Sequence, residues 1–357
     1  MLDVPENEVK AHGTFVEPAM IDANARQASS ALGSMAQGRI SMQRVALIYN
    51  PVSGQHSARR ATAVQGALAV FRAAGVSAEV FECATPGSVA AHVEEAIRQG
   101  CDAVLACGGD GTVHAVLQSL VGTEIALGVI PLGTANALAA DLGLVGSPAA
   151  AARALLAAHP VRILVGQIYF KDSAGSPGSR YFIVAAGIGA DALLMSRMDA
   201  RLKRRFGYAL YLVEAFRVWA TGSFPLFEAA FTGGGSATAR TMDVSQLLAV
   251  RVRSFGGVLR ELAPGATLRN GTLQLLAFRT QSRRRLMRFL LAVLFRRHTF
   301  SGEIELLETT KVDCSARDGS VDHIFVEADG EVLGSLPVRL EVVPNALTLL
   351  IPPNAQP

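Results

Sequence analysis

Four short apolar runs alternate with four amphipathic stretches between residues 44 and 158, and this alternation restricts the possible folds more than any other feature. The apolar runs cover residues 44–49, 76–80, 102–106 and 125–130. The helical stripes cover residues 61–71, 89–97, 113–120 and 148–158. Strands that alternate with helices in this way are typical of a parallel sheet with helices on both faces. The sequence therefore predicts a doubly wound α/β domain in the first half of the chain.

Three polar turns follow the first, third and fourth of these strands. They cover residues 50–54, 108–112 and 131–136. Ligands of open parallel sheets bind beyond the carboxyl ends of the strands. Because all three turns fall at that edge, we expect them to line one binding site.

The turn at residues 108–112 has the composition of a phosphate loop. Gly108, Gly109 and Gly111 lack the Cβ atoms that would keep a ligand away from the backbone, and a helix starts directly after them. Backbone N–H groups at such a turn suit a phosphate. Asp110 would repel that phosphate unless the carboxylate meets a cation or a hydroxyl group. The alternative is a plain tight turn in which Asp110 caps the helix.

The pattern changes to β-like runs after residue 160. These runs cover residues 161–170, 180–185, 226–231, 247–255, 272–279, 303–310, 322–326 and 338–343. Gly-rich turns such as residues 232–235 separate several of them, and a helix is expected at residues 202–219. This pattern predicts a second domain built as an antiparallel β-sandwich.

Composition limits the classes of function. A net charge of +3 without an ordered set of aromatic residues argues against a nucleic-acid partner. The four cysteines show no CxxC spacing, so we interpret them as reduced core residues of a cytoplasmic protein. Residues 1–42 carry no secretory signal pattern and are expected to form a flexible extension, with a short helix at 21–31 left open. The apolar run 286–295 is too short to cross a bilayer.

Several separated motifs together resemble one family. The motifs are Asn50-Pro51-Val52-Ser53-Gly54, Gly108-Gly109-Asp110-Gly111-Thr112, Pro131-Leu132-Gly133-Thr134-Ala135-Asn136, Ala186-Gly187-Ile188-Gly189-Ala190-Asp191-Ala192, Lys203-Arg204-Arg205-Phe206-Gly207-Tyr208, Asp329-Gly330-Glu331 and Pro344-Asn345-Ala346-Leu347. In this order they are similar to the motifs of the diacylglycerol kinase catalytic superfamily, which includes bacterial lipid kinases and sphingosine kinases. A Gly-Gly-Asp-Gly-Thr loop alone also occurs in NAD kinases, so the resemblance rests on the joint set across residues 43–353.

The resemblance implies an ATP-binding α/β domain at residues 43–163 and a β-sandwich lipid-substrate domain at residues 164–345. It leaves open whether residues 346–352 return to the first domain. It further implies an ATP-dependent lipid kinase that phosphorylates a hydroxyl group of a diacylglycerol-like or sphingoid lipid. The implied nucleotide-site residues are Asn50, Pro51, Ser53, Gly54, Thr85, Gly108, Gly109, Asp110, Gly111, Thr112, Val113, His114, Thr134 and Asn136.

The resemblance also implies catalytic and metal-binding residues. Asp329 or Glu331 would be the catalytic base, and Asp110 would be the nearest partner of the Mg²⁺ that travels with ATP. The alternative for residues 329–331 is a plain hairpin turn, because Asp-Gly is a common turn pair. A structural Mg²⁺ site is implied at Thr267, Asn270 and Thr272, although asparagine is a neutral ligand and this loop could equally be a simple hairpin.

Three positions depart from the pattern, because Ala115, Ala137 and Leu164 stand where the family commonly has acidic residues. This departure motivates a second hypothesis, a lipid- or nucleotide-binding protein with little turnover. An NAD-kinase-like enzyme is the other alternative.

Two basic stretches bear on the lipid side of the reaction. Residues 283–297 are apolar with arginines at both ends, which suits the surface of an anionic membrane on the inner, cytoplasmic side. The alternative is a core helix that exposes its arginines to solvent. Residues 201–205 form a second basic cluster, or merely a solvated helix face. A homodimer is left open.

Overall fold

The computed structural model describes residues 42–51, 57–83, 85–172, 174–197, 208–232, 240–255, 262–294, 303–317 and 324–355. All described residues belong to one compact unit, residues 40–357. The predicted flexible extension at residues 1–42 thus lies outside the described residues, apart from Met42. The basic residues 201–205 and the turn at 233–235 lie outside them as well.

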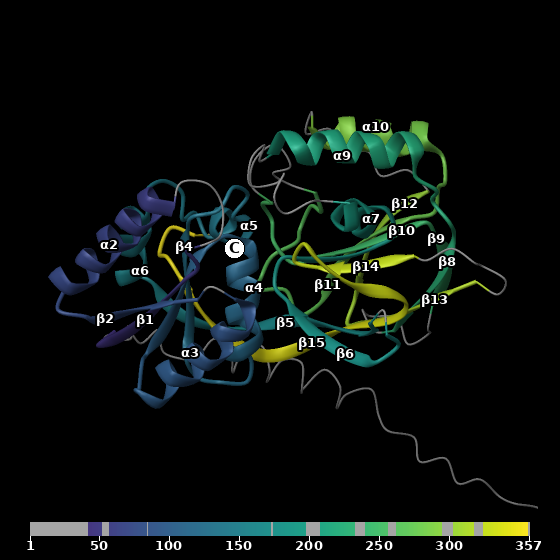
Figure 1. Ribbon diagram of the computed structural model, residues 1–357. Coiled ribbons are helices and arrows are strands. Elements are labelled where there is room, and N and C mark those ends of the chain that lie inside the picture. The colour runs from purple at the N-terminus through teal and green to yellow at the C-terminus, as the bar shows by residue number, and fades with distance from the viewer. Residues whose placement is uncertain are drawn as a thin grey trace, which may run out of the picture. The chain divides into compact units, whose positions relative to one another are not determined.

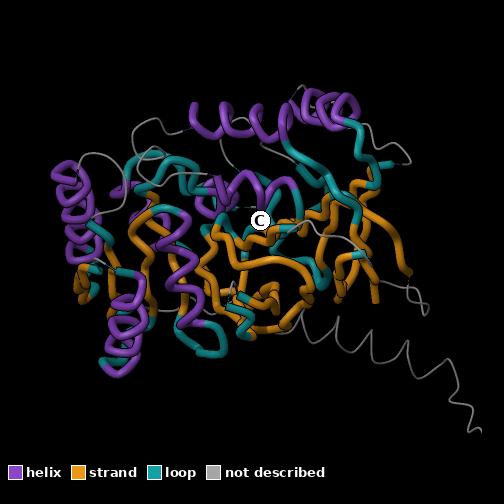
Figure 2. Tube along the Cα trace, turned by 45° about the vertical axis from the view of Figure 1, so that its right-hand side comes forward, coloured by secondary structure: helices purple, strands orange, loops and turns teal. Residues whose placement is uncertain are grey.

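The first half is a parallel sheet covered by helices on both faces. Its elements are β1 (Arg44–Tyr49), α2 (Ser57–Ala73), β2 (Ser77–Glu82), α3 (Pro86–Arg98), β3 (Ala103–Gly108), α4 (Asp110–Leu120), β4 (Ala126–Pro131), α5 (Ala137–Asp141) and α6 (Pro148–Leu156). The strands lie in the order β4-β3-β1-β2 and pair in parallel throughout. Helices α2 and α6 pack together on one side, and α3 and α4 pack together on the other (Figures 1 and 2). The predicted α/β architecture is confirmed.

The local sequence explains these elements. All six residues of β3 and five of the six in β1 are buried, as expected for strands covered on both faces. Gly75 and Gly100 adopt positive φ angles of 78° and 68° and end helices α2 and α3. At the first of these ends, Val76 N donates to the carbonyl of Phe71 over 3.0 Å, which closes the last turn of α2.

The second half is mainly antiparallel. Its elements are β5 (His159–Lys171), β6 (Pro177–Phe182), β7 (Ala185–Ile188), α7 (Ala190–Arg197), α9 (Tyr208–Thr221), β8 (Phe227–Thr232), β9 (Arg240–Val244), β10 (Gln246–Val250), β11 (Leu273–Phe278), α10 (Arg283–Leu294), β12 (Ile304–Thr309), β13 (Lys311–Ala316), β14 (Phe325–Ala328) and β15 (Glu331–Ile351). The strands enclose a second hydrophobic core, whereas other buried residues of β10, β11 and α10 belong to the same cluster as the core of the first half. The predicted sandwich-like second half is confirmed.

Strand β15 connects the two halves. It starts beside β14, continues against β13 and β5, and ends parallel to β4, where Thr348 and Leu349 pair with Ala126 and Leu127. Through β15 the described strands form one 15-stranded sheet (Figure 1). The same strand therefore begins at the acidic turn around residue 330 and ends inside the parallel half.

Several elements of the second half differ from the prediction. The strand expected at residues 180–185 is split into β6 and β7, because Ile183 N and Val184 N donate to the side chain of Asp329 and not to a neighbouring strand. The strand expected at residues 247–255 ends at Val250. Strands β9 and β13 and helix α7 were not predicted; they are short, with five, six and eight residues, so each gives only a brief sequence pattern. The described part of the inserted helix starts at Tyr208.

Candidate active site

Two of the predicted polar turns touch each other at the carboxyl edge of the parallel strands. Leu132 N donates to the carbonyl of Gly108 over 2.8 Å. A Cβ atom placed on Gly133 would lie 2.6 Å from the Cα of Gly109, a distance that no side chain tolerates. Glycine is therefore required here for close approach of two backbones, and the turns at residues 108–112 and 131–136 form one surface.

Asp110 joins the same two turns. One carboxylate oxygen accepts a hydrogen bond from Ala137 N at 2.7 Å, and the other accepts one from Asn136 N at 3.0 Å. Asn136 adopts a left-handed φ of 50°, and its side chain folds back onto the N–H and carbonyl of Gly133. The carboxylate of Asp110 thus faces the start of α5, where the helix dipole and two N–H groups stabilise its negative charge.

Only some of the other predicted nucleotide-site residues can be placed relative to these turns. Strand β1 lies in register beside β3, with Tyr49 opposite Cys107, so Asn50 and Pro51 emerge at the same edge. Ser53 and Gly54 lie outside the described residues. Thr85 and Thr134 are exposed, whereas the side chains of Thr112, Val113 and His114 are buried. For the last three, contact with a nucleotide would have to come from the backbone.

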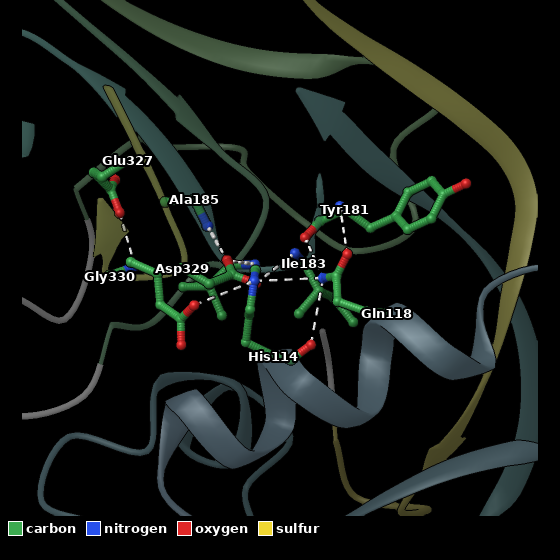
Figure 3. Close-up of polar contacts among 10 residues, drawn as sticks. His114, Gln118, Tyr181, Ile183, Ala185, Glu327, Asp329 and Gly330 are labelled. Atoms are coloured by element: carbon green, nitrogen blue, oxygen red, sulfur yellow. Dashed lines mark hydrogen bonds and ion pairs between the residues drawn. The ribbon is translucent and has the colours of Figure 1, made fainter. Parts of the chain in front are cut away.

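The acidic turn at residues 329–331 is a tight hairpin turn between β14 and β15. Asp329 and Gly330 adopt φ angles of 49° and 85°, the left-handed pair that two-residue hairpins prefer. The carboxylate of Asp329 is 3% exposed and accepts hydrogen bonds from three consecutive backbone N–H groups, those of Ile183, Val184 and Ala185, at 2.9 to 3.0 Å (Figure 3). The plain-hairpin alternative is therefore right about the shape of this turn, but the turn is also tied to the start of β7.

His114 connects α4 to the acidic turn. Its Nδ1 lies 3.3 Å from the Asp329 carboxylate and its Nε2 lies 3.9 Å from that of Glu331. Burial is the largest single influence and lowers the pKa of His114, but the hydrogen bond to Asp329 and the negative charges of Asp329 and Glu331 together outweigh it, so the pKa of His114 is raised above its ordinary value. Gln118, one turn further along α4, holds both backbone groups of Tyr181 with its amide (Figure 3). The glycine-rich turn and the acidic turn are thus fixed relative to each other through α4.

Glu331 differs from Asp329 in exposure. Its side chain is 52% exposed, and a carboxylate oxygen lies 3.7 Å from the position that a Cβ of Gly111 would take. The carboxylate therefore lies over the first turn of α4. Of the two acids predicted as the catalytic base, Asp329 already accepts hydrogen bonds within the protein, whereas the carboxylate of Glu331 lies next to the glycine-rich turn.

A second acidic pair lies behind the turn. Glu327 accepts a hydrogen bond from Gly330 N at 2.7 Å (Figure 3). Its carboxyl group and that of Asp191 both lie close to Gly187, since a Cβ atom there would be 2.8 Å from a Glu327 oxygen and 2.7 Å from an Asp191 oxygen. Burial raises the pKa of Glu327 well above its ordinary value, and the charge of Asp191 raises it further. Burial likewise raises the pKa of Asp191. Two carboxylates this close cannot both be ionised, so we interpret them as sharing a proton. Asp191 belongs to the motif at residues 186–192, but no sequence pattern indicated a role for Asp191 or Glu327.

The residues predicted to hold a structural Mg²⁺ do not fit that ion. Thr267 Oγ1 accepts a hydrogen bond from Arg269 N, and the Asn270 amide donates to the carbonyl of Gly265 at 2.9 Å. The carbonyls of Asn270 and Thr272 accept hydrogen bonds from the buried guanidinium of Arg251. In the part of the chain that the structure describes, no group of three or more His, Cys, Asp or Glu residues could hold a metal ion.

Helices α9 and α10 lie side by side at the outer edge of the second half (Figures 1 and 2). The apolar face of α10 is packed inward, with Leu286, Phe289 and Val293 buried, which agrees with the core-helix alternative. Arg283 is engaged internally, because its guanidinium donates to the carbonyls of Ala220 and Gly222 at the end of α9. None of the described helices has the length and apolar character needed to cross a membrane.

Comparison with known proteins gives matches for both halves. The family model of the diacylglycerol kinase catalytic domain matches residues 44–168, and the model of the YegS C-terminal NAD kinase beta sandwich-like domain matches residues 183–351. A diacylglycerol kinase of Mycobacterium tuberculosis is 30% identical over 317 residues, which cover 87% of this chain and 95% of that protein. A diacylglycerol kinase of Bacillus subtilis is 25% identical, with 83% and 92% covered.

The fold is similar to that of a solved protein. A crystal structure of a diacylglycerol kinase from Bacillus anthracis superposes with a TM-score of 0.64 at 17% identity, covering 88% of this chain and 99% of that one. At this identity the likeness concerns the fold alone, and it includes both halves and their connection.

Proposed function

Because the chain belongs to the diacylglycerol kinase catalytic superfamily and is a lipid kinase, we propose that it transfers the γ-phosphoryl group of ATP to a hydroxyl group of a diacylglycerol-like or sphingoid lipid. The single observation that carries this proposal is the position of the Glu331 carboxylate over the first turn of α4, close to Gly111. The turn that would bind the phosphates of ATP and the carboxylate that would take up the hydroxyl proton then lie next to each other.

The glycine-rich turn supplies the phosphate side in this proposal. The N-terminus of α4 carries the positive end of a helix dipole, and Gly111 in its first turn is exposed and has no side chain to keep a ligand away. Asp110 holds the second turn against the first through Asn136 and Ala137, so that both turns keep one shape when MgATP binds. Mg²⁺ enters with ATP as part of the substrate and neutralises charge on the phosphates.

Glu331 supplies the proton acceptor. Phosphoryl transfer depends on positioning and charge stabilisation, and a carboxylate close to the attacking hydroxyl group takes up its proton. Asp329 cannot easily fill this role, since three N–H groups and His114 already contact its oxygens. We assign Asp329 to positioning: it fixes the hairpin turn that carries Glu331.

Incubation with γ-labelled ATP and a panel of acceptors tests the proposed function. The panel contains a diacylglycerol, a sphingoid base and NAD, with the Glu331→Gln variant as control. We expect label in a lipid for the wild type and a loss of that label for the variant. Label in NAD alone would instead support an NAD-kinase-like enzyme. Binding of ATP without any transfer would support a binding protein, as the alanines at positions 115 and 137 and Leu164 suggest.

We also propose that α9 and α10 contact an anionic membrane surface on the cytoplasmic side. The side chains of Val213 and Phe216 on α9 and Leu291 on α10 are 55%, 59% and 46% exposed. On α10, Arg284 and Arg288 are exposed and share one helix face with Leu291. Exposed apolar side chains beside arginines suit an interface between lipid headgroups and acyl chains.

Replacing Arg284 and Arg288 by serine should weaken binding to vesicles that contain phosphatidylglycerol. Each basic residue near such a surface contributes about 1 kcal/mol, so the double variant should bind roughly tenfold or more weakly at low salt. Sedimentation with vesicles measures this change. Replacing the exposed Arg72 and Arg153 of the first half by serine is the matched control and should have little effect. Equal binding of the α10 variant and the wild type would contradict membrane contact through these helices.

A further inference from the structure

Arg251 is the largest of the fully buried side chains in the described chain, with 1% of its surface exposed. It follows directly after β10, and its guanidinium group is surrounded by backbone carbonyls. Nη1 donates to the carbonyls of Asn270 and Thr272 at 3.2 and 3.1 Å, and Nη2 donates to those of Leu164 and Leu268 at 3.1 and 3.0 Å. One cation thus holds four carbonyl oxygens from β5 and from the loop that leads into β11.

This charge has no carboxylate partner among the described residues. The ion pairs that they form leave out Arg251, and its Nε has no hydrogen-bond partner among them. Burial lowers the pKa of Arg251 to about 10, so the group still carries its charge at neutral pH. Burying a charge without an opposite charge is costly unless oriented dipoles offset the loss of water. Here the carbonyl dipoles of four residues provide that compensation.

A shell of carbonyl oxygens is also the way in which proteins hold hard divalent cations. Two of the carbonyls that accept from Arg251 belong to Asn270 and Thr272, which the family resemblance implies as Mg²⁺ ligands. A metal ion bound to the same oxygens would lie next to the guanidinium group, and the two buried positive charges would repel each other. Moreover, Asn270 carries no charge and donates its amide to Gly265. The carbonyl oxygens of this loop that could serve as metal ligands therefore already accept hydrogen bonds from the protein's own groups.

We propose that the guanidinium group of Arg251 is the built-in cation of the loop at residues 265–272 and takes the place of a divalent metal ion there. The backbone of Arg251 is linked to the acidic turn through Val184. Arg251 N donates to the carbonyl of Val184 at 2.9 Å, and Val184 N donates to the carboxylate of Asp329. The second half should consequently fold and hold Asp329 without a structural metal, which leaves MgATP as the source of any Mg²⁺ requirement.

Metal titration of the nucleotide-free wild type tests this proposal without measuring activity. We expect the same melting temperature, within about 1 °C, in EDTA and in about 5 mM MgCl₂, a concentration above the range in which weak sites fill. Electron paramagnetic resonance measures how much added Mn²⁺ is bound. We expect the same bound fraction for the wild type and for Asn270→Ala. A saturable rise in melting temperature, or a Mn²⁺ site that Asn270→Ala abolishes, would overturn the proposal.

Substitution of Arg251 gives the complementary test. Arg251→Met leaves four buried carbonyls without a donor, and we expect the melting temperature to fall by roughly 10 °C or more. Arg269→Met removes an exposed arginine from the same loop and is the matched control, with an expected shift within about 2 °C. A melting temperature of Arg251→Met equal to that of the control would contradict the role of the guanidinium. If Arg251→Met does not fold, the Mn²⁺ measurement on the wild type decides.

Discussion

Replacing Glu331 by glutamine should reduce kcat for lipid phosphorylation by a factor of roughly 10² to 10⁴, the range that removal of a general base typically costs. The substitution keeps the size of the side chain but removes its ability to take up the hydroxyl proton. Because Glu331 is half exposed and its contact with His114 is long, 3.9 Å, the melting temperature should change little. Steady-state kinetics with ATP and the preferred lipid measure kcat, and KM for ATP should stay within a few-fold of the wild type.

A matched control for this prediction is Glu228→Gln. Glu228 is an exposed glutamate on β8, away from the acidic turn. This variant should keep the kcat of the wild type. If Glu331→Gln retained more than about a tenth of the wild-type kcat, Glu331 would not be the base, given the size of such effects.

Replacing Asp329 by asparagine should act on stability first. Asparagine tolerates the left-handed φ of 49°, so the backbone needs no change. The variant loses the negative charge that accepts three backbone hydrogen bonds and faces His114. Since hydrogen bonds to charged groups contribute more than neutral ones, we expect the free energy of unfolding to fall by about 2 to 4 kcal/mol. Urea denaturation measures this loss, and kcat should fall as well because the turn that carries Glu331 is less well fixed.

The loss should also depend on pH, because Asp329 raises the pKa of His114. A histidine whose pKa is higher in the folded protein stabilises it fully below the unfolded pKa of 6.5, and this contribution is lost as the pH rises through the folded value. The difference between wild type and Asp329→Asn should therefore be larger near pH 6 than at pH values above the folded pKa of His114. Asp243→Asn, which changes an exposed carboxylate on β9, is the control. A difference that is the same at every pH would contradict the Asp329–His114 interaction.

The parallel half could be predicted from the sequence because its determinants are local. The apolar runs of β1 and β3, the glycines that end α2 and α3, and the polar turns after the strands all appear within short windows. Once the strands are known to be parallel, their carboxyl ends must lie at one edge, so the meeting of the turns at residues 108–112 and 131–136 follows. The close approach of the Gly109 and Gly133 backbones shows that these two turns are in contact, as predicted.

The rest depends on contacts between residues far apart in the chain. His114 and Asp329 are separated by 215 positions, and no periodicity reveals that they touch. The break between β6 and β7 has the same origin, since Ile183 and Val184 look like strand residues but donate to Asp329. Arg251 likewise lies inside the strand expected at residues 247–255, and no local pattern indicates that four carbonyl groups surround its side chain. In each case a buried polar group outweighs the local pattern.

Hydrogen–deuterium exchange with and without a non-hydrolysable ATP analogue tests most directly whether the glycine-rich turns and the acidic turn form one nucleotide site. We expect slower exchange on nucleotide binding in peptides that cover residues 108–114, 132–137 and 329–331. Peptides from β8, β9 and α10 should exchange at the same rate in both states. Slower exchange only in β8, β9 or α10, with unchanged exchange in the three turns at saturating nucleotide, would contradict a single nucleotide site at these turns.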